Sequence, residues 1–303
     1  MGYDGEGRLR YNAFLSRYPF AVDAYELGFL TGIREDYGFQ AEGVRNVDLE
    51  VGMLDNDFED PDINRYLELF DRFDPSIAVV GDAYSHADAV EYQEVVDELS
   101  QEHPYKTYIV APKCREAFEV LEDSVTLGYP IGYSDLDPFD VAPLSEWRGN
   151  EIHILGGSPT KQWDAIRELT QPTLTGLPSA EVVGVDWNGP HKVAYMGEHW
   201  SRDGWQPADH LSIRETVRKS LEEIKEFWLE REFWPGTELR ELNGEAVLEP
   251  DEPIYIDRGG EPISSREDLE DAVVREYEHG VYAFDSEVQA DFIEYRERWL
   301  EKL

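Results

Sequence analysis

The sequence predicts an α/β fold, a (β/α)8 TIM-like barrel with a C-terminal helical appendage. Between residues 48 and 187 one theme repeats: a short β-branched apolar run, a polar residue at its end, and then a helical stretch. Such alternation is typical of a parallel sheet. Six regular units with more chain on each side favour a closed barrel over an open doubly wound sheet. No G-x-G-x-x-G follows the first run, which argues against a dinucleotide-binding fold.

The expected elements follow in chain order. Residues 1–47 are expected to add one or two strands and a covering helix. The runs predicted as strands are DLEVGML (48–54), SIAVVG (76–81), KTYIVA (106–111), TLGYPIG (126–132), EIHILG (151–156) and AEVVGV (180–185). The amphipathic segments predicted as helices between them include residues 87–102, 114–124 and 160–171.

The pattern changes after Trp205. Residues 211–232 predict one long helix, an Asn-Gly turn lies within 242–248, and the tail from Ser265 again has helical periodicity. We therefore expect a barrel over residues 1–205 and a mainly helical extension over residues 206–303 that packs on it.

Charge is the unusual feature of the composition. The chain has 66 acidic and 27 basic residues, a formal net charge of −39, and the acids are spread throughout. Self-repulsion on this scale is best tolerated where salt screens it, so we expect a halophilic cytoplasm. The single cysteine, Cys114, excludes an intrachain disulfide and a cysteine-rich zinc site. No stretch approaches the length of an apolar membrane span.

The acidity argues against binding that depends on Lys and Arg neutralising phosphates. In molar salt, however, that contribution is weak for any protein, and recognition must rest on shape, stacking and hydrogen bonds. The expected path of a nucleic-acid strand is the least acidic window, residues 188–220; the alternative is a solvated helix face with internal ion pairs. The basic residues of this window are Lys192, Arg202, Arg214, Arg218 and Lys219.

In a (β/α) barrel the functional side chains lie at the carboxyl ends of the strands. The residues that follow the six apolar runs are Asp55-Asn56, Asp82, Pro112-Lys113, Tyr133-Ser134, Gly157-Ser158 and Asp186-Trp187-Asn188. Asp is also a good N-cap and turn residue, so any one of the three aspartates could be structural. All three at the same position of three strands favour a shared site.

The segment around Asp186 has the most specific spacing. In VVGVDWNGPHKVAYMGEHW (182–200), Pro190 lies four residues after Asp186, Lys192 six and Gly197 eleven. This pattern resembles the tRNA-guanine transglycosylases, which carry a nucleophilic Asp at a strand end followed by Pro, a basic residue and Gly at these intervals. Four other segments resemble the family's strand ends in the same order: MLDND (53–57), AVVGDAY (78–84), GYPIGYS (128–134) and IHILGGSP (152–159).

The resemblance, which covers about residues 50–200, implies a base exchange by double displacement. Asp186 would be the nucleophile and Asp55 the acid–base partner, while Asp82 would bind the guanine edge. It implies substrate binding by Asn56, Asp82, Gly132, Tyr133, Gly156, Gly157, Trp187 and Lys192. The expected partners are a nucleic acid and a free 7-deazaguanine base, and no metal or cofactor is expected.

This sequence departs from the family at several positions. One cysteine cannot supply the family's zinc site, and Ala111-Pro112 stands where the family has a glutamine. Asp57 and Phe58 replace glycines, and Lys192 replaces an arginine, which removes a bidentate phosphate contact. A short version without zinc is similar to the DpdA-type relatives of phages and archaeal viruses, which place 7-deazaguanines into DNA. The oligomeric state stays open, because family members dimerise around the zinc region.

DNA is therefore the expected substrate, with tRNA as the alternative. A second class of function is a barrel hydrolase in which the three aspartates hold a metal ion. A third is a non-catalytic barrel that binds a partner through residues 206–303.

Overall fold

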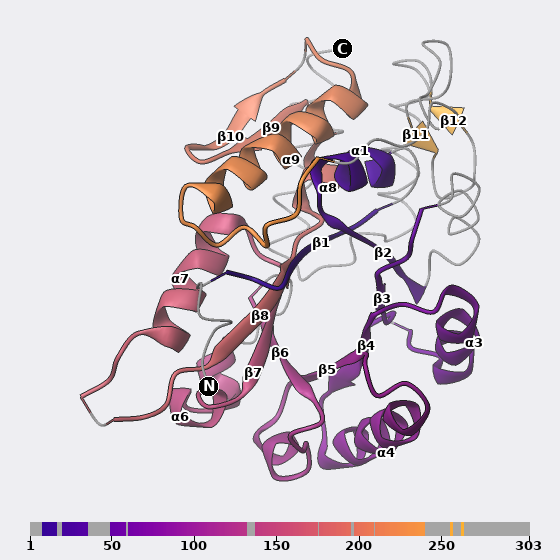
Figure 1. Ribbon diagram of the computed structural model, residues 1–303, viewed down its shortest axis with the longest axis vertical. Helices are drawn as coiled ribbons and strands as arrows, with labels where there is room; N and C mark the ends of the chain where they lie inside the picture. Colours follow the sequence, from indigo (N-terminus) through magenta and orange to yellow (C-terminus); the bar gives the residue numbers. More distant parts are fainter. Residues whose placement is uncertain are drawn as a thin grey trace.

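Eight parallel strands form a closed barrel in the computed structural model (Figure 1). The structure describes residues 8–16, 20–35, 49–58, 60–131, 137–174, 176–194, 197–208, 210–239, 255–256 and 262–263. The strands are ordered as in the chain, and β8 pairs with β1 to close the ring. Closure confirms the (β/α)8 prediction and rules out the open sheet.

All six predicted runs overlap barrel strands, and residues 1–47 supply two more strands with a helix between them. The barrel strands are β1 Tyr11–Leu15, β2 Leu30–Arg34, β3 Met53–Asp55, β4 Ile77–Ala83, β5 Thr107–Pro112, β6 Thr126–Pro130, β7 Glu151–Leu155 and β8 Glu181–Asp186. The helices are α1 Phe20–Leu27, α3 Ile63–Phe73, α4 His86–Glu102, α5 Pro138–Val141, α6 Leu144–Trp147, α7 Pro159–Thr170, α8 Gly189–Val193 and α9 Ile213–Leu229, with a 3-10 turn η2 at Arg115–Glu119. Two hairpins complete the described chain: β9 Glu198–Ser201 with β10 Gly204–Pro207, and β11 Tyr255–Ile256 with β12 Pro262–Ile263.

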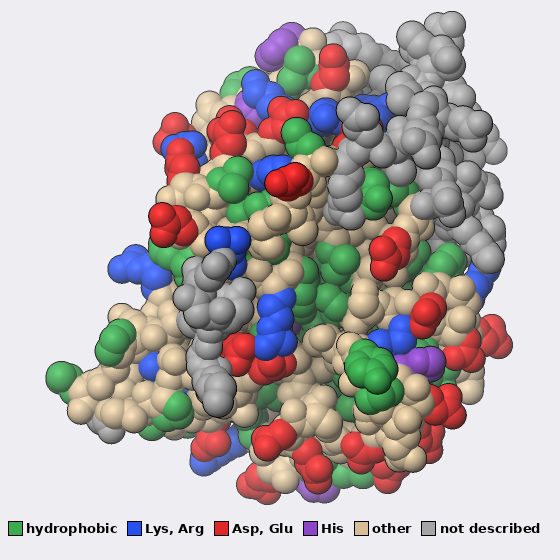
Figure 2. Space-filling model, in the orientation of Figure 1, with side chains coloured by type: hydrophobic (Ala, Val, Ile, Leu, Met, Phe, Trp, Pro, Cys, Tyr) green, Lys and Arg blue, Asp and Glu red, His purple; other side chains and the backbone are tan. Residues whose placement is uncertain are grey.

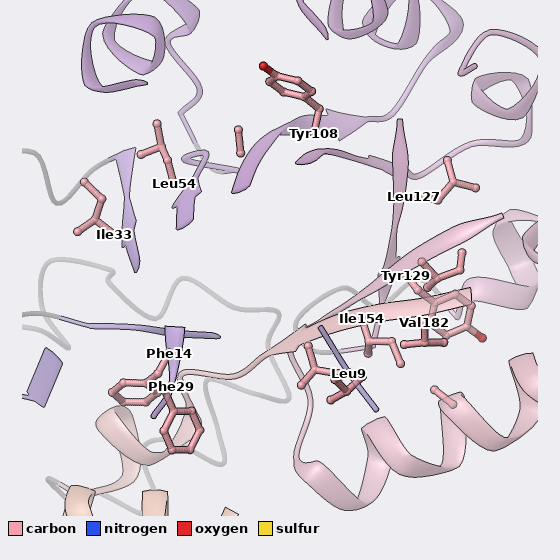
Figure 3. Close-up of a cluster of buried hydrophobic side chains, with 14 of the residues drawn as sticks. Leu9, Phe14, Phe29, Ile33, Leu54, Tyr108, Leu127, Tyr129, Ile154 and Val182 are labelled. Atoms are coloured by element: carbon pink, nitrogen blue, oxygen red, sulfur yellow. The ribbon is translucent and has the colours of Figure 1, made fainter. Parts of the chain in front are cut away.

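The barrel has two apolar layers because both faces of each strand are buried. The inner layer fills the barrel and consists of Tyr11, Ala13, Leu15, Met53, Ile77, Val79, Ile109 and Val183. The outer layer lies between the strands and the surrounding helices. Figure 3 shows its side chains leaving the ring of strands, with Phe14 beside Phe29 and Ile154 near Val182.

Two irregularities decide which side chains face into the barrel. In β4 the pairing with β5 shifts between Val79 and Gly81, and a Cβ at Gly81 would collide with the ring of Tyr92 on α4. Gly81 therefore faces outward, and Asp82 faces inward. Such bulges are known to re-aim side chains near active sites.

A similar shift in strand pairing occurs in β8. Its pairing with β7 shifts so that Val182 pairs with Ile152 but Gly184 pairs with His153. Val183 and Gly184 thus both face the barrel interior, where a Cβ at Gly184 would meet the ring of Tyr11. Strand alternation then turns Val185 outward and Asp186 inward.

The C-terminal part begins with α9, which packs against α1, α7, α8 and β9 (Figure 1). A capping box at Ser212 and Glu215 starts this helix, which lies within the predicted helix over 211–232. Buried Asp23 of α1 accepts hydrogen bonds from Arg214 and Arg218 of α9 and joins the two helices. The predicted turn at 242–248 and the helical tail from Ser265 lie outside the described residues.

No helix in the described part of the chain is long and apolar enough to cross a membrane.

Candidate active site

Three carboxylates from separate strands face the barrel interior at its carboxyl end. Asp55 ends β3 two residues after Met53 of the inner layer, so both lie on the inner side. Asp82 and Asp186 reach the same side through the two bulges of β4 and β8. Since the carboxyl ends of parallel strands meet at one end of a barrel, the strand-end aspartates open onto a common region.

Asp186 is held by a histidine and a backbone N–H group. Its side chain is 11% exposed. Its Oδ1 lies 3.1 Å from His153 Nε2 and accepts from the backbone N–H of Gly156 at 3.2 Å. Among the described residues no group bonds Oδ2. One oxygen is therefore fixed by two donors while the other is left for a further partner.

A buried chain of side chains stands behind this contact. The Tyr11 hydroxyl lies 2.9 Å from His153 Nδ1, and the two rings stack with centroids 5.4 Å apart. Burial, together with the charge of Asp186, raises the pKa of Tyr11 well above its usual range. Tyr11 therefore stays protonated, and the tautomer in which it donates to Nδ1 is the one in which the imidazole donates from Nε2 to Asp186.

The backbone around Asp186 is fixed as well. Gln162 of α7 is buried, and its Nε2 donates to the carbonyl oxygens of Gly156 at 3.0 Å and Asp186 at 2.8 Å. One amide thus ties together the ends of β7 and β8. Gly156 and Gly157 have φ of 69° and 74°, a region that favours glycine, and a Cβ at Gly157 would meet Ile131.

Asp82 has a different kind of partner. Lys113, which follows β5, places its Nζ 3.4 Å from Asp82 Oδ1, and the two side chains are only 6% and 13% exposed. Burial raises the pKa of Asp82, and the nearby Lys113 charge opposes that rise. Tyr84, two residues on, is 55% exposed, and the Asp82 charge contributes to a raised pKa of its phenol.

The loop after β3 is organised by a buried acid that sequence reasoning did not single out. Glu35 accepts from the backbone N–H groups of Asp57 and Asp62 at 2.9 and 3.0 Å, and from Arg65 Nε at 2.9 Å. Asn56 is buried in this loop. The loop that follows Asp55 is thereby anchored to Glu35, the residue after β2.

The other predicted substrate-binding residues have varied positions. Trp187 packs its ring against Trp200 and Trp205, with centroids 5.9 and 5.6 Å away, beside the outer core. Lys192 lies in α8, but its side chain is outside the described part, as are Gly132 and Tyr133. Their predicted contacts with substrate, like those of Asn56, Gly156 and Gly157, stay predictions.

The predicted nucleic-acid path contains arginines that are already paired within the chain. Arg214 and Arg218 bind Asp23, Arg218 also binds Glu26, and Arg202 binds Glu230. Arg218 also forms an i,i+4 pair with Glu222, as the alternative interpretation expects, whereas its other partners and those of Arg214 lie on α1. Figure 2 shows one face of the molecule, on which Lys and Arg side chains also lie beside Asp and Glu side chains.

Within the described ranges, no three His, Cys, Asp or Glu side chains are grouped so that they could hold a metal ion. Asp55, Asp82 and Asp186 therefore face the same end of the barrel without forming a ligand set. The metal-dependent hydrolase gains no support from this arrangement.

Sequence reasoning missed the residues that support the aspartates: Tyr11, Lys113, Gln162 and, as a partner of Asp186, His153. His153 is fully buried in β7. Its inward position on β7 and the strand-end position of Lys113 were the available signals. Neither signal shows which carboxylate each residue meets.

Comparison with known proteins assigns the chain to a family. No curated protein matches the chain. The chain is similar to the solved structure of the YdjI aldolase from Escherichia coli K12, with 14% identity, a TM-score of 0.45, and coverage of 80% of this chain and 95% of that one. At this level the likeness carries no inference about activity, and the transglycosylase resemblance rests on the motifs alone. The model described as "Family of unknown function (DUF6610)" matches residues 24–229, and the chain belongs to that family.

Proposed function

We propose that this protein exchanges guanine for a 7-deazaguanine base in DNA through a covalent intermediate on Asp186. The observation that carries the proposal is the setting of that carboxylate. It is inward-facing and largely buried, and His153 and Gly156 fix Oδ1 while Oδ2 has no partner among the described residues. A nucleophile needs this combination of fixed orientation and an available atom.

In the first step Asp186 Oδ2 bonds to C1′ of the sugar as the C1′–N9 bond to guanine breaks, and Asp55 protonates the leaving base. In the second step N9 of the incoming base attacks C1′ and displaces Asp186, and its proton passes to Asp55. Two displacements restore the original configuration, as in retaining glycosidases. Proton transfer by one carboxyl and bonding by the other require two acids in different surroundings.

The identity of the donors around Asp186 favours this role. A lysine or arginine paired with the carboxylate would compete with the positive charge that develops at C1′ in an oxocarbenium-like state. The described contacts to Asp186 come instead from an imidazole that donates through Nε2 and from a backbone N–H. These donors orient the carboxylate and leave its negative charge to stabilise the reacting sugar carbon.

The test is incorporation of a labelled 7-deazaguanine into DNA and into tRNA, offered separately in molar salt. We expect label in DNA and a protein–nucleic acid adduct whose mass shift disappears in Asp186→Ala. Glu181→Gln is the matched control, because Glu181 lies on the same strand at its other end. Label in tRNA alone would replace the DNA substrate by tRNA, and label in neither would overturn the transglycosylase.

A barrel that only binds a partner predicts a different result. In that case Asp186→Asn should leave binding of the partner unchanged, because the substitution keeps the size of the side chain. A metal-dependent hydrolase predicts loss of activity on chelation, whereas the proposed exchange requires no metal.

A further inference from the structure

We infer that Lys113 is a specificity-determining residue that donates a hydrogen bond to the O6 carbonyl of the exchanged base, beside Asp82. This inference rests on the proposed function and adds the residue that selects the base. It starts from a feature that the double displacement does not use. Lys113 is nearly buried at the carboxyl end of a barrel strand, where an ammonium group is costly to desolvate.

The Lys113–Asp82 pair is placed to meet a ligand. Both residues face inward: Asp82 pairs with Ala111 in the β4–β5 register, and Lys113 lies two residues beyond Ala111. Lys113 Nζ is 3.4 Å from Asp82 Oδ1, longer than the usual charge-assisted hydrogen bond. The two groups therefore stand side by side without being fully engaged with each other.

A donor next to an acceptor complements one edge of guanine. On that edge the O6 carbonyl accepts a hydrogen bond, and the neighbouring N1–H donates one. A lysine ammonium can only donate and an ionised carboxylate can only accept, so Lys113 matches O6 and Asp82 matches N1–H. A 7-deazaguanine has the same edge, because it differs from guanine at position 7. One pair of residues can therefore hold the leaving and the incoming base in turn.

The same pair rejects a purine with an amine at position 6. Two donors would then face each other, and the buried ammonium would lose its partner. Sites built to hydrogen-bond a group discriminate strongly against analogues that lack it, because buried polar groups are left unpaired. Such a purine also has no hydrogen on N1, so Asp82 would meet an acceptor lone pair there, and both residues contribute to the selection.

The experiment measures binding of free bases by calorimetry, which needs no nucleic acid and no transfer. The probes are guanine, hypoxanthine, which keeps O6 and N1–H, and 2,6-diaminopurine, which replaces O6 by an amine. The variants are Lys113→Met, which removes the donor, and Lys113→Gln, which keeps a neutral donor. Lys106→Met is the control, because Lys106 precedes the same strand at its other end and pairs with Asp74.

We expect the wild type and Lys106→Met to bind guanine and hypoxanthine and to exclude 2,6-diaminopurine. Lys113→Met should weaken guanine and hypoxanthine binding about tenfold to a hundredfold, the range for a hydrogen bond to a charged group. It should also reduce the discrimination against 2,6-diaminopurine, and the part that remains is due to Asp82, which still meets the N1 lone pair. Lys113→Gln should restore part of the guanine affinity. Thermal unfolding of each variant verifies that it is folded.

The outcomes separate the two proposals. Equal guanine affinity in the wild type and Lys113→Met would overturn the role of Lys113 and leave the base exchange standing. Base selection that depends on Lys113, with no label entering DNA or tRNA, would support the base site and overturn the exchange. A wild type that binds none of the three bases would overturn both.

Discussion

The two ends of the barrel differ in how far their charged groups are buried, although the same strands build both. At the amino end Arg10 lies 2.6 Å from Glu151 and 2.5 Å from Glu181, the first residues of β7 and β8. The Arg10 side chain is 47% exposed, and opposite charges meet there in water. At the carboxyl end of these two strands Asp186 is largely buried, and its described partners are His153 and Gly156.

We expect substitutions at the two ends to separate effects on stability from effects on function. Exposed ion pairs are nearly neutral energetically and weaken in salt, so the amino end depends little on them. A buried carboxylate whose described partners are an imidazole and a backbone N–H is costly to desolvate, and such groups are enriched at functional sites. Conditions and substitutions that act on the two ends should therefore give effects of very different size.

Replacing the buried acid should have the largest effect. Asp186→Asn keeps the shape of the side chain but removes the nucleophilic oxygen, so base exchange should fall by at least about a thousandfold. Glu181→Gln, at the other end of β8, should leave the rate within about twofold. Steady-state incorporation of labelled base measures both, and comparable losses would mean that the two ends are not functionally distinct.

Substitution of His153, which contacts Asp186, should have the second-largest effect. His153→Phe leaves the Tyr11 hydroxyl without its partner and leaves Asp186 Oδ1 with only the Gly156 N–H, and a buried group left unpaired costs about 1–3 kcal/mol. We expect a loss of about 3 kcal/mol in the free energy of unfolding, together with a lower kcat. The exposed His86→Phe should change stability by less than about 0.5 kcal/mol. Denaturation at fixed salt compares them, and equal stabilities would contradict the buried hydrogen-bond chain.

The pH dependence of base binding tests the charged pair. Guanine needs the ionised form of Asp82, whose pKa is raised by burial against the opposing Lys113 charge. Guanine affinity should therefore rise with pH through a midpoint above that of an ordinary aspartate, and Lys113→Met should move the midpoint higher. For folding the sign is reversed: the contribution of Asp82 to stability is present at low pH and is lost as pH rises through its raised pKa. A midpoint unchanged in Lys113→Met would show that the two groups are not coupled.

The smallest effect belongs to the amino end. Arg10→Gln removes both exposed ion pairs and should cost about 0–1 kcal/mol at low salt, and nothing measurable in molar salt, where such pairs are screened. Denaturation at the two salt concentrations provides the comparison. A cost that persists in molar salt would show that Arg10 contributes through packing rather than charge.

The sequence predicted the barrel well because its signal is local. β-Branched runs alternate with amphipathic segments, and each predicted run overlaps a strand of the closed sheet. The strand-end positions of Asp55, Asp82 and Asp186 followed from the same alternation. The supporting residues could not be predicted in this way. Tyr11 and His153 are 142 positions apart in the chain, and only closure of β8 onto β1 brings them together.

The sequence by itself determined the fold class, the order of the strands and the chemical types at the strand ends, because these depend on patterns a few residues long. Only the tertiary structure decided which way two of the aspartates point. Strict alternation from Val79 and Val183 would have turned Asp82 and Asp186 toward the helices. One extra residue in each strand, seen only in its pairing with a neighbour, turns both carboxylates into the barrel.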